Sequence, residues 1–131
     1  MSLHQSGEDY LEAILVLQEK NGVVHSIDVA QYLGYSKPSV SRAVSVLKGD
    51  GYLVMERDGR LKLTEQGEEI ARSIYERHRF LKHWLIELGV SPELAEEDAC
   101  KIEHAISEET FLCLKRHTEE MSALRTQMPN P

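Results

Sequence analysis

The stretch "SKPSVSRAVSVLKGDGYLVMERDGRLKLT", Ser36–Thr64, decides the fold of this chain. Its first half predicts a helix, because Ser36 suits an N-cap, Pro38 suits the first turn, and valine and leucine recur at helical spacing. Its second half places two short apolar runs on either side of Asp58-Gly59, and Asp-Gly is a strong hairpin signal. The stretch therefore predicts a helix followed by a β-hairpin.

Two more helices are predicted upstream of this stretch. Residues 6–22 have Ser6 as the expected cap, acidic residues in the first turn and Asn-Gly at the end. A short helix follows, with Ser26 as its expected cap and Gly34 after its last turn. Helix, short helix, turn, helix and hairpin is the order of a winged helix-turn-helix, a DNA-binding fold that can also serve as a protein-binding scaffold.

The rest of the chain is predicted to be helical. Residues 64–88 form a long amphipathic pattern, and two further helices are expected after the caps Ser91 and Ser107. The predicted fold class is therefore mainly α. A winged helix-turn-helix domain with a small β-hairpin wing (residues 1–64) precedes an all-helical domain (residues 65–131).

Charge is spread unevenly along the chain. The net charge is -7, yet residues 36–62 contain six bases and three acids. A local basic patch on an acidic protein can still dock on phosphate, so we expect this window to contact DNA. Arg42 suits a guanine edge and Pro38 a thymine methyl. The candidate DNA-contacting residues are Ser36, Lys37, Pro38, Ser39, Ser41 and Arg42 on the predicted recognition helix, and Arg57 and Arg60 on the wing.

A second pattern points to a metal. Cys100, Glu103 and His104 have the spacing i, i+3, i+4, which places thiolate, carboxylate and imidazole donors on one face of a helix. Each residue alone is more often a solvated or packed side chain than a ligand. The candidate metal ligands are Asp9, Glu12, His78, Cys100, Glu103 and His104.

Five segments together resemble the DtxR/MntR family of metal-dependent transcriptional repressors. They are "EDYLEAI" near the start, "SVSRAVSVLKGDGYL" in the predicted reader, "LTEQGEEIA" after the wing, "RHRFL", and "DACKIEHAIS". The resemblance covers residues 8–117 and is closest to short, two-domain members. It implies a homodimer that binds a palindromic double-stranded DNA operator when a divalent metal is bound, with repression of metal-uptake genes as the expected role.

The resemblance also implies a mixed metal site. Asp9, Glu12 and His78 match the manganese branch of the family, whereas Cys100 stands where that branch has a glutamate and matches the iron branch. Because a thiolate is a soft ligand, the pattern favours Fe(II), with Mn(II) next and Co(II) or Zn(II) possible in vitro. The cysteine leaves one or two ions per subunit open. Lys82 and Glu96 occupy the positions that the iron branch uses in its second site around His78, and Lys82 is a cation.

Composition supports the remaining expectations. No apolar run is long enough to span a membrane, and two cysteines do not suggest a disulfide framework, so a cytoplasmic protein is expected. No pattern indicates a small-molecule substrate or an enzyme. Two alternatives remain, namely a winged-helix regulator not controlled by metal and a metal-binding protein without a DNA role.

Candidate residues for the dimer interface or the domain's own core are Leu81, Trp84, Leu85, Leu88, Phe111, Leu112 and Leu114.

Overall fold

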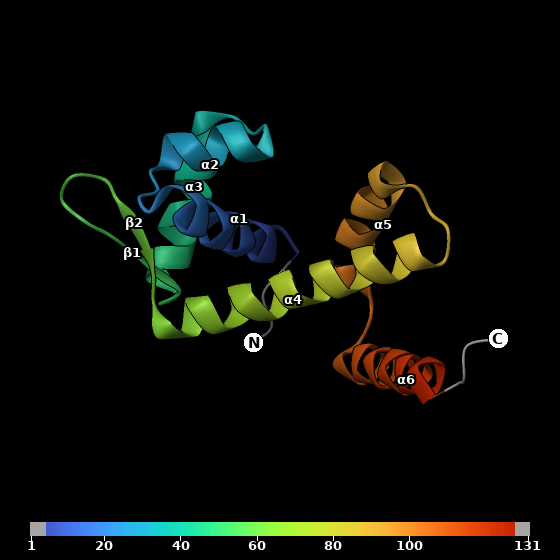
Figure 1. Cartoon of the computed structure of the whole chain (residues 1–131). Coiled ribbons are helices and arrows are strands. Elements are labelled where there is room, and N and C mark those ends of the chain that lie inside the picture. The colour runs from blue at the N-terminus through green and yellow to red at the C-terminus, as the bar shows by residue number, and fades with distance from the viewer. Residues whose placement is uncertain (1–4, 128–131) are drawn as a thin grey trace. The chain divides into compact units, whose positions relative to one another are not determined.

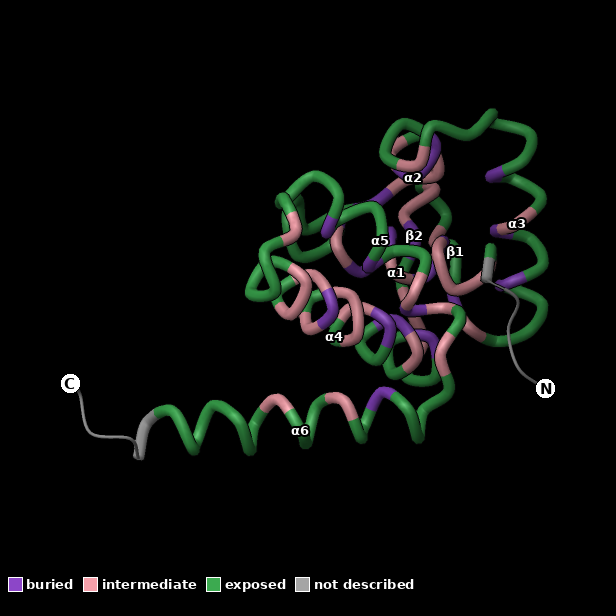
Figure 2. The backbone as a smooth tube through the Cα atoms, turned by 90° about the vertical axis from the view of Figure 1, so that its right-hand side faces the viewer, coloured by how far each residue is buried: buried purple, intermediate pink, exposed green. Residues whose placement is uncertain are grey.

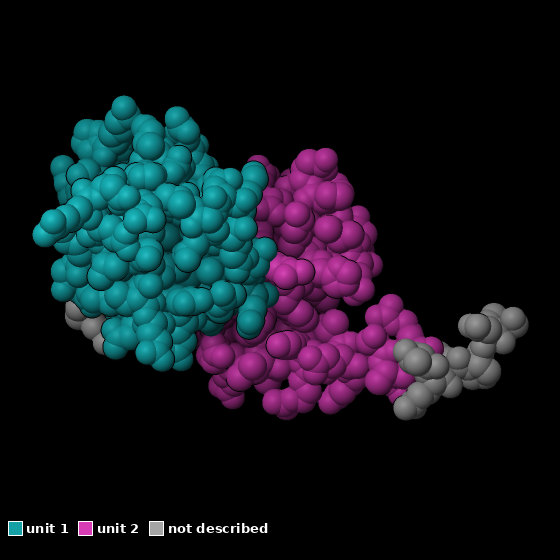
Figure 3. Space-filling model, turned by 60° about the vertical axis from the view of Figure 1, so that its left-hand side comes forward, with its two compact units in different colours: residues 1–76 teal, residues 77–131 magenta. Residues whose placement is uncertain are grey.

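The computed structural model describes residues 5–127, which are mostly helical, as predicted (Figure 1). The chain divides into two compact units between Glu76 and Arg77 (Figure 3). The predicted boundary after residue 64 stays a prediction. The elements are α1 (Gln5–Asn21), α2 (Ser26–Leu33), α3 (Lys37–Gly49), β1 (Leu53–Met55), β2 (Leu61–Leu63), α4 (Glu65–Glu87), α5 (Pro92–Ala105) and α6 (Glu108–Gln127).

The first unit has a core built around α1. Leu11 and Ile14 of this helix are completely buried, and α2, α3 and the hairpin add Val29, Val40 and Leu53. These side chains lie on one face of each element, because apolar residues recur with the period of that element. Figure 2 shows the result along α3, where buried positions alternate with longer exposed runs.

The turn between α2 and α3 is tight, as a helix-turn-helix requires. Gly34 adopts the left-handed conformation with φ 73°, and its N–H donates to the carbonyl of Ala30 over 2.9 Å. Ser36 then caps α3, accepting a hydrogen bond from the N–H of Ser39 over 3.3 Å. The predicted cap Ser36 is confirmed.

Two other predicted caps are wrong. Helix α1 already includes Gln5 and Ser6, so Ser6 is not its cap. The cap of α2 is His25 rather than Ser26, because Asp28 accepts a hydrogen bond from the backbone N–H of His25 over 2.8 Å. This contact extends the helix by one residue toward its N-terminus.

The predicted hairpin is present and forms the wing. Strands β1 and β2 pair antiparallel, with Leu53 opposite Leu63 and Met55 opposite Leu61. The N–H of Leu61 also donates to the carbonyl of Val24 over 2.8 Å, which ties the wing to the helical core. Together with α2 and α3, the wing completes a winged helix-turn-helix.

The second unit contains the later part of α4 with α5 and α6. Ser91 caps α5 and Ser107 caps α6, each accepting a hydrogen bond from an N–H three residues later. Phe80 of α4 packs edge-on against Phe111 of α6, with ring centroids 5.5 Å apart. Beyond Phe111, most of α6 is exposed (Figure 2).

Candidate functional site

Helix α5 buries one charged residue. Ala95, Ala99 and Glu103 recur every four residues and form its buried face. Glu103 is 0 % exposed, and no other charged residue among residues 6–125 is fully buried. A buried carboxylate is costly unless it is paired, so its neighbours reveal what the position is for.

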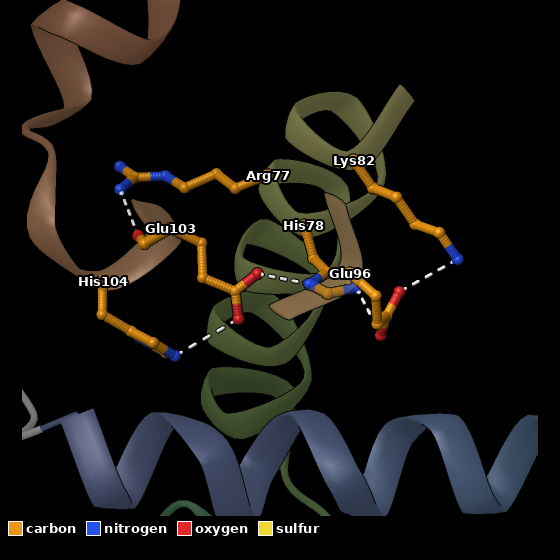
Figure 4. A network of polar contacts seen from close by, with 6 residues as sticks. All are labelled: Arg77, His78, Lys82, Glu96, Glu103 and His104. Atoms are coloured by element: carbon orange, nitrogen blue, oxygen red, sulfur yellow. Dashed lines mark hydrogen bonds and ion pairs between the residues drawn. The ribbon is translucent and has the colours of Figure 1, made fainter. Parts of the chain in front are cut away.

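Two imidazoles flank this carboxylate (Figure 4). One oxygen of Glu103 lies 2.9 Å from Nδ1 of His78, and the other lies 3.2 Å from Nε2 of His104. The two rings are nearly buried, with 13 % and 2 % of their side chains exposed. The structure therefore brings together three of the predicted metal ligands, from α4 and α5, around one buried oxygen pair.

A second carboxylate holds the outer side of His78. Nε2 of His78 lies 3.0 Å from Glu96, and the other oxygen of Glu96 lies 2.9 Å from Nζ of Lys82. The hydrogen bond to Glu103 is the largest cause that raises the pKa of His78, to about 9, and burial acts against it. For Glu96, burial acts to raise the pKa of the carboxyl. The contacts with Lys82 and His78 outweigh burial and lower that pKa.

Arg77 fixes the end of α5 beside this network. Its guanidinium donates to the carbonyls of Glu103 and Ile106, each over 3.2 Å, and forms an ion pair with Glu108. The guanidinium also lies 5.3 Å from the ring centroid of Phe111. A cation at a helix C-terminus satisfies the last carbonyls, so Arg77 holds the turn that carries Glu103.

The remaining predicted ligands lie on α5 and α1. Cys100 is exposed, one turn before Glu103, and its coordination of a metal stays a prediction. Asp9 and Glu12 are half-buried on α1, and their nearest ligand oxygens lie within 4.8 Å of each other. One turn of helix thus presents two hard oxygen donors side by side.

The predicted recognition helix presents a polar outer face. Its buried residues are Val40, Val44 and Leu47. All six predicted contact residues of this segment are exposed, although the hydroxyl of Ser36 is also used in the cap. These residues are Ser36, Lys37, Pro38, Ser39, Ser41 and Arg42.

The two wing arginines differ. Arg57 is exposed, whereas Arg60 lies 2.8 Å from Glu56 and 2.7 Å from Asp58. The backbone N–H of Arg60 donates to Asp58, and this bond is the largest cause that lowers the pKa of Asp58. Arg60 is therefore already engaged within the wing.

The predicted interface residues differ in how much surface they keep. Leu81 and Phe111 are buried in the single chain, and Trp84, Leu85 and Leu114 are half-buried. Leu88 and Leu112 are 65 % and 46 % exposed. Trp84 and Leu88 of α4 also line a groove with Met121 of α6.

Three residues that matter here were not among the predicted site residues: Arg77, Lys82 and Glu96. Spacing alone contained a signal for one of them. Glu96, Cys100 and Glu103 are separated by four and then three residues, so Glu96 shares the face of the predicted ligands. Nothing in the sequence distinguished Arg77 from the other bases on α4.

Comparisons with known proteins agree along most of the chain. Residues 2–61 match the family described as "Iron dependent repressor, N-terminal DNA binding domain", and residues 64–125 match "Iron dependent repressor, metal binding and dimerisation domain". The chain is 36% identical over 116 residues to the transcriptional regulator MntR of Escherichia coli O157:H7, covering 88% of this chain and 75% of that protein. This chain belongs to the DtxR/MntR family.

Other relatives extend the match. An uncharacterized HTH-type transcriptional regulator of Methanocaldococcus jannaschii is 37% identical to this DtxR/MntR member over 120 residues, covering 90% of this chain and 96% of that protein. The structure of the manganese regulator SloR has a TM-score of 0.77 at 26% identity and 91% coverage of this chain. A manganese-dependent transcriptional repressor in complex with manganese gives a TM-score of 0.78 at 27% identity and 85% coverage. The chain spans only 55% and 51% of those two solved chains.

Family membership establishes the general activity. The protein is a metal-dependent transcriptional repressor and not an enzyme, and the family binds DNA operators and dimerises. The two alternatives that the sequence left open, a regulator indifferent to metal and a metal protein without DNA, are therefore set aside. Among residues 5–127, no helix is both long and apolar enough to cross a membrane.

Proposed function

We propose that this repressor binds a palindromic operator as a homodimer when Fe(II), or next Mn(II), is bound by Asp9, Glu12, His78, Cys100, Glu103 and His104. One observation supports the proposal most strongly, which is the buried carboxylate of Glu103 between the imidazoles of His78 and His104. Carboxylate and imidazole donors with one thiolate suit a first-row divalent ion. The donor set therefore fits the metal that the family implies.

The residues would do the following work. Glu103 and the half-buried pair Asp9 and Glu12 would supply anionic oxygens, and His78 and His104 would supply ring nitrogens. A bound divalent cation would offset the negative charge of these carboxylates. Because α1 belongs to the DNA-reading unit and α5 to the other, a ligand set drawn from both couples metal occupancy to operator affinity.

Two considerations oppose each other on the identity of the metal. Cys100 favours Fe(II), because its thiolate is soft and Mn(II) is the hardest and most weakly bound of the candidate ions. The names of two similar structures mention manganese, which favours Mn(II). We propose Fe(II) as the activating metal on the basis of Cys100, with Co(II) and Zn(II) able to bind in vitro.

A DNA-binding titration tests the function. Binding to the protein's own promoter is measured with Fe(II), Mn(II), Co(II) and Zn(II) in turn, and with a chelator. We expect tight binding only with metal, and loss of the metal response in His104→Ala. The matched control is His83→Ala, since His83 is 73 % exposed and pairs only locally with Glu87. Chelator-insensitive binding, or a normal metal response in His104→Ala, would contradict the proposal.

Co(II) spectroscopy tests the role of Cys100 directly. A cobalt-bound thiolate gives a charge-transfer band in the near ultraviolet, so we expect this band in the loaded protein and its loss in Cys100→Ser. Cys113→Ser is the matched control, because Cys113 is also exposed but lies on α6. Cys100→Glu should shift the DNA response toward Mn(II). A band that survives Cys100→Ser would remove Cys100 from the ligand set and favour Mn(II).

A further inference from the structure

Glu96 differs from the other acidic residues near the centre. It is not one of the ligands proposed above, its side chain is 52 % exposed, and yet it holds a nearly buried histidine. Resting on the proposed function, we propose that Glu96 is a positioning residue that fixes the His78 ring, so that Nδ1 and not Nε2 is the metal-binding nitrogen.

The argument begins with the two ring nitrogens of His78. Nδ1 lies 2.9 Å from the buried carboxylate of Glu103, and Nε2 lies 3.0 Å from Glu96 (Figure 4). Only Nδ1 can share an ion with Glu103, because the ring directs Nε2 toward the other carboxylate. A histidine that binds a metal through one nitrogen normally donates the other N–H to a carboxylate or carbonyl, which fixes the tautomer and the ring.

Glu96 is itself held in place. Lys82 lies 2.9 Å from its second oxygen, so one oxygen faces the lysine and the other faces Nε2 of His78. Lys82 and His78 are one helical turn apart on α4, and Glu96 lies on the face of α5 that also carries Glu103. The two helices thus place the ammonium, the carboxylate and the imidazole in a row that ends at Glu103.

The alternative role for Glu96 is that of a direct metal ligand. A glutamine at this position separates the two roles, because its amide oxygen can accept the Nε2–H bond but is a poor ligand for a transition metal ion. We therefore expect Glu96→Ala to weaken Mn(II) binding about 10- to 100-fold, which is typical when such a partner is lost. Glu96→Gln should retain most of the affinity. Glu97→Ala, an exposed neighbour on α5, is the matched control and should bind like wild type.

The measurement combines Mn(II) titration calorimetry with a test of coupling. In a His78→Ala background, Glu96→Ala should cause no further loss, because its effect acts through His78. Additive losses would show a general structural effect and overturn the proposal, and equal losses in Glu96→Ala and Glu96→Gln would make Glu96 a ligand. Wild-type affinity in His78→Ala would instead remove His78 from the ligand set, so it would contradict the proposed function as well.

Nitrogen NMR supplies a readout independent of affinity. With the diamagnetic ion Zn(II) bound, the chemical shifts of the two ring nitrogens of His78 show which nitrogen carries a proton and which one binds the metal. We expect a proton on Nε2 and metal on Nδ1 in wild type and in Glu96→Gln, and loss of this pattern in Glu96→Ala. Metal on Nε2 in the wild type would overturn the positioning role, while leaving the proposed metal-dependent repressor intact.

Discussion

In the metal-free protein, the two carboxylate partners of His78, Glu103 and Glu96, raise the pKa of its ring and so favour the charged imidazolium. Its pKa of about 9 exceeds the ordinary value of 6.5, chiefly because of the hydrogen bond with Glu103. A raised folded-state pKa contributes stability that is fully present below about pH 6.5 and is lost as pH rises through about 9.

We therefore expect the metal-free protein to lose unfolding free energy between about pH 6.5 and 9. Urea denaturation in the presence of a chelator measures this loss. The reference is His78→Gln, which cannot gain the proton, so the difference between the two proteins should decline over the same range. A constant difference across this range would mean that folding does not raise the pKa of the His78 ring.

The site could be predicted from the sequence only where spacing carried the information. Glu103 and His104 were predicted as ligands from their place one turn after Cys100, and the structure places Glu103 between His78 and His104. Cys100 is exposed, and its role as a ligand stays a prediction, because periodicity does not encode how far a single cysteine is exposed. The role of Arg77 depends on carbonyls 26 and 29 residues away, which no local pattern reveals.

At the scale of elements, the junction between the wing and α4 requires a glycine. Thr64 caps the helix, accepting a hydrogen bond from the N–H of Gly67 over 3.2 Å and donating from Oγ1 to the carbonyl of Gly51 over 2.7 Å. A Cβ on Gly67 would lie 1.9 Å from the backbone oxygen of Tyr52. Backbone cannot move aside as a flexible side chain can.

We expect Gly67→Ala to lower the unfolding free energy by about 1–3 kcal/mol or more, the usual range for overpacking. Gly49→Ala is the matched control, because Gly49 is helical, ends α3 and has open space around its Cα. That substitution should be neutral or stabilise by up to about 1 kcal/mol. Chemical denaturation of both variants tests this, and equal stabilities would mean that the junction tolerates a side chain.

The wing provides a second prediction at this scale. Arg57 is exposed, whereas Arg60 is paired with Glu56 and Asp58 within the hairpin. If Arg57 meets a phosphate, Arg57→Ala should weaken specific and non-specific DNA binding alike and reduce the salt slope by about 1. Arg60→Ala should change the salt slope less, and its surface ion pairs should cost at most about 1 kcal/mol of stability. Fluorescence anisotropy at several salt concentrations measures both, and a larger slope change for Arg60 would reverse the assignment.

The elements themselves were largely predictable. The caps Ser36, Ser91 and Ser107 and the hairpin around Asp58-Gly59 were predicted correctly, because each is a local signal with a local cause. The cap predicted at Ser26 was wrong by one residue, because Asp28 accepts its hydrogen bond from the backbone N–H of His25. A cap made by a side chain three residues later is harder to recognise than a cap residue.

At the scale of the whole molecule, basic residues are concentrated in one segment of an otherwise acidic chain. The basic window at residues 36–62 lies on α3 and the wing, although the chain as a whole has a charge of -7.

In the other unit α6 remains mostly exposed, with Leu112, Met121 and Leu124 between 43% and 54% accessible. Exposed apolar side chains along one helix are consistent with the dimerisation that the family shows.

A symmetric dimer makes the spacing of the DNA half-sites a testable property. Two recognition helices related by a twofold axis meet successive major grooves on one side of the duplex only when the half-sites are about 10–10.5 base pairs apart, or a multiple of this. We expect an insertion of about 5 base pairs, half a helical turn, between the half-sites to abolish metal-dependent binding, because the second half-site then faces away. An electrophoretic mobility shift with metal, on operators carrying insertions of zero, about 5 and about 10 base pairs, makes the measurement. The control operators keep the original half-site spacing and carry insertions of the same lengths in the flanking DNA instead. Undiminished affinity for the 5-base-pair operator would mean that each subunit reads DNA independently, and the metal would then have to act within a single chain rather than through the dimer.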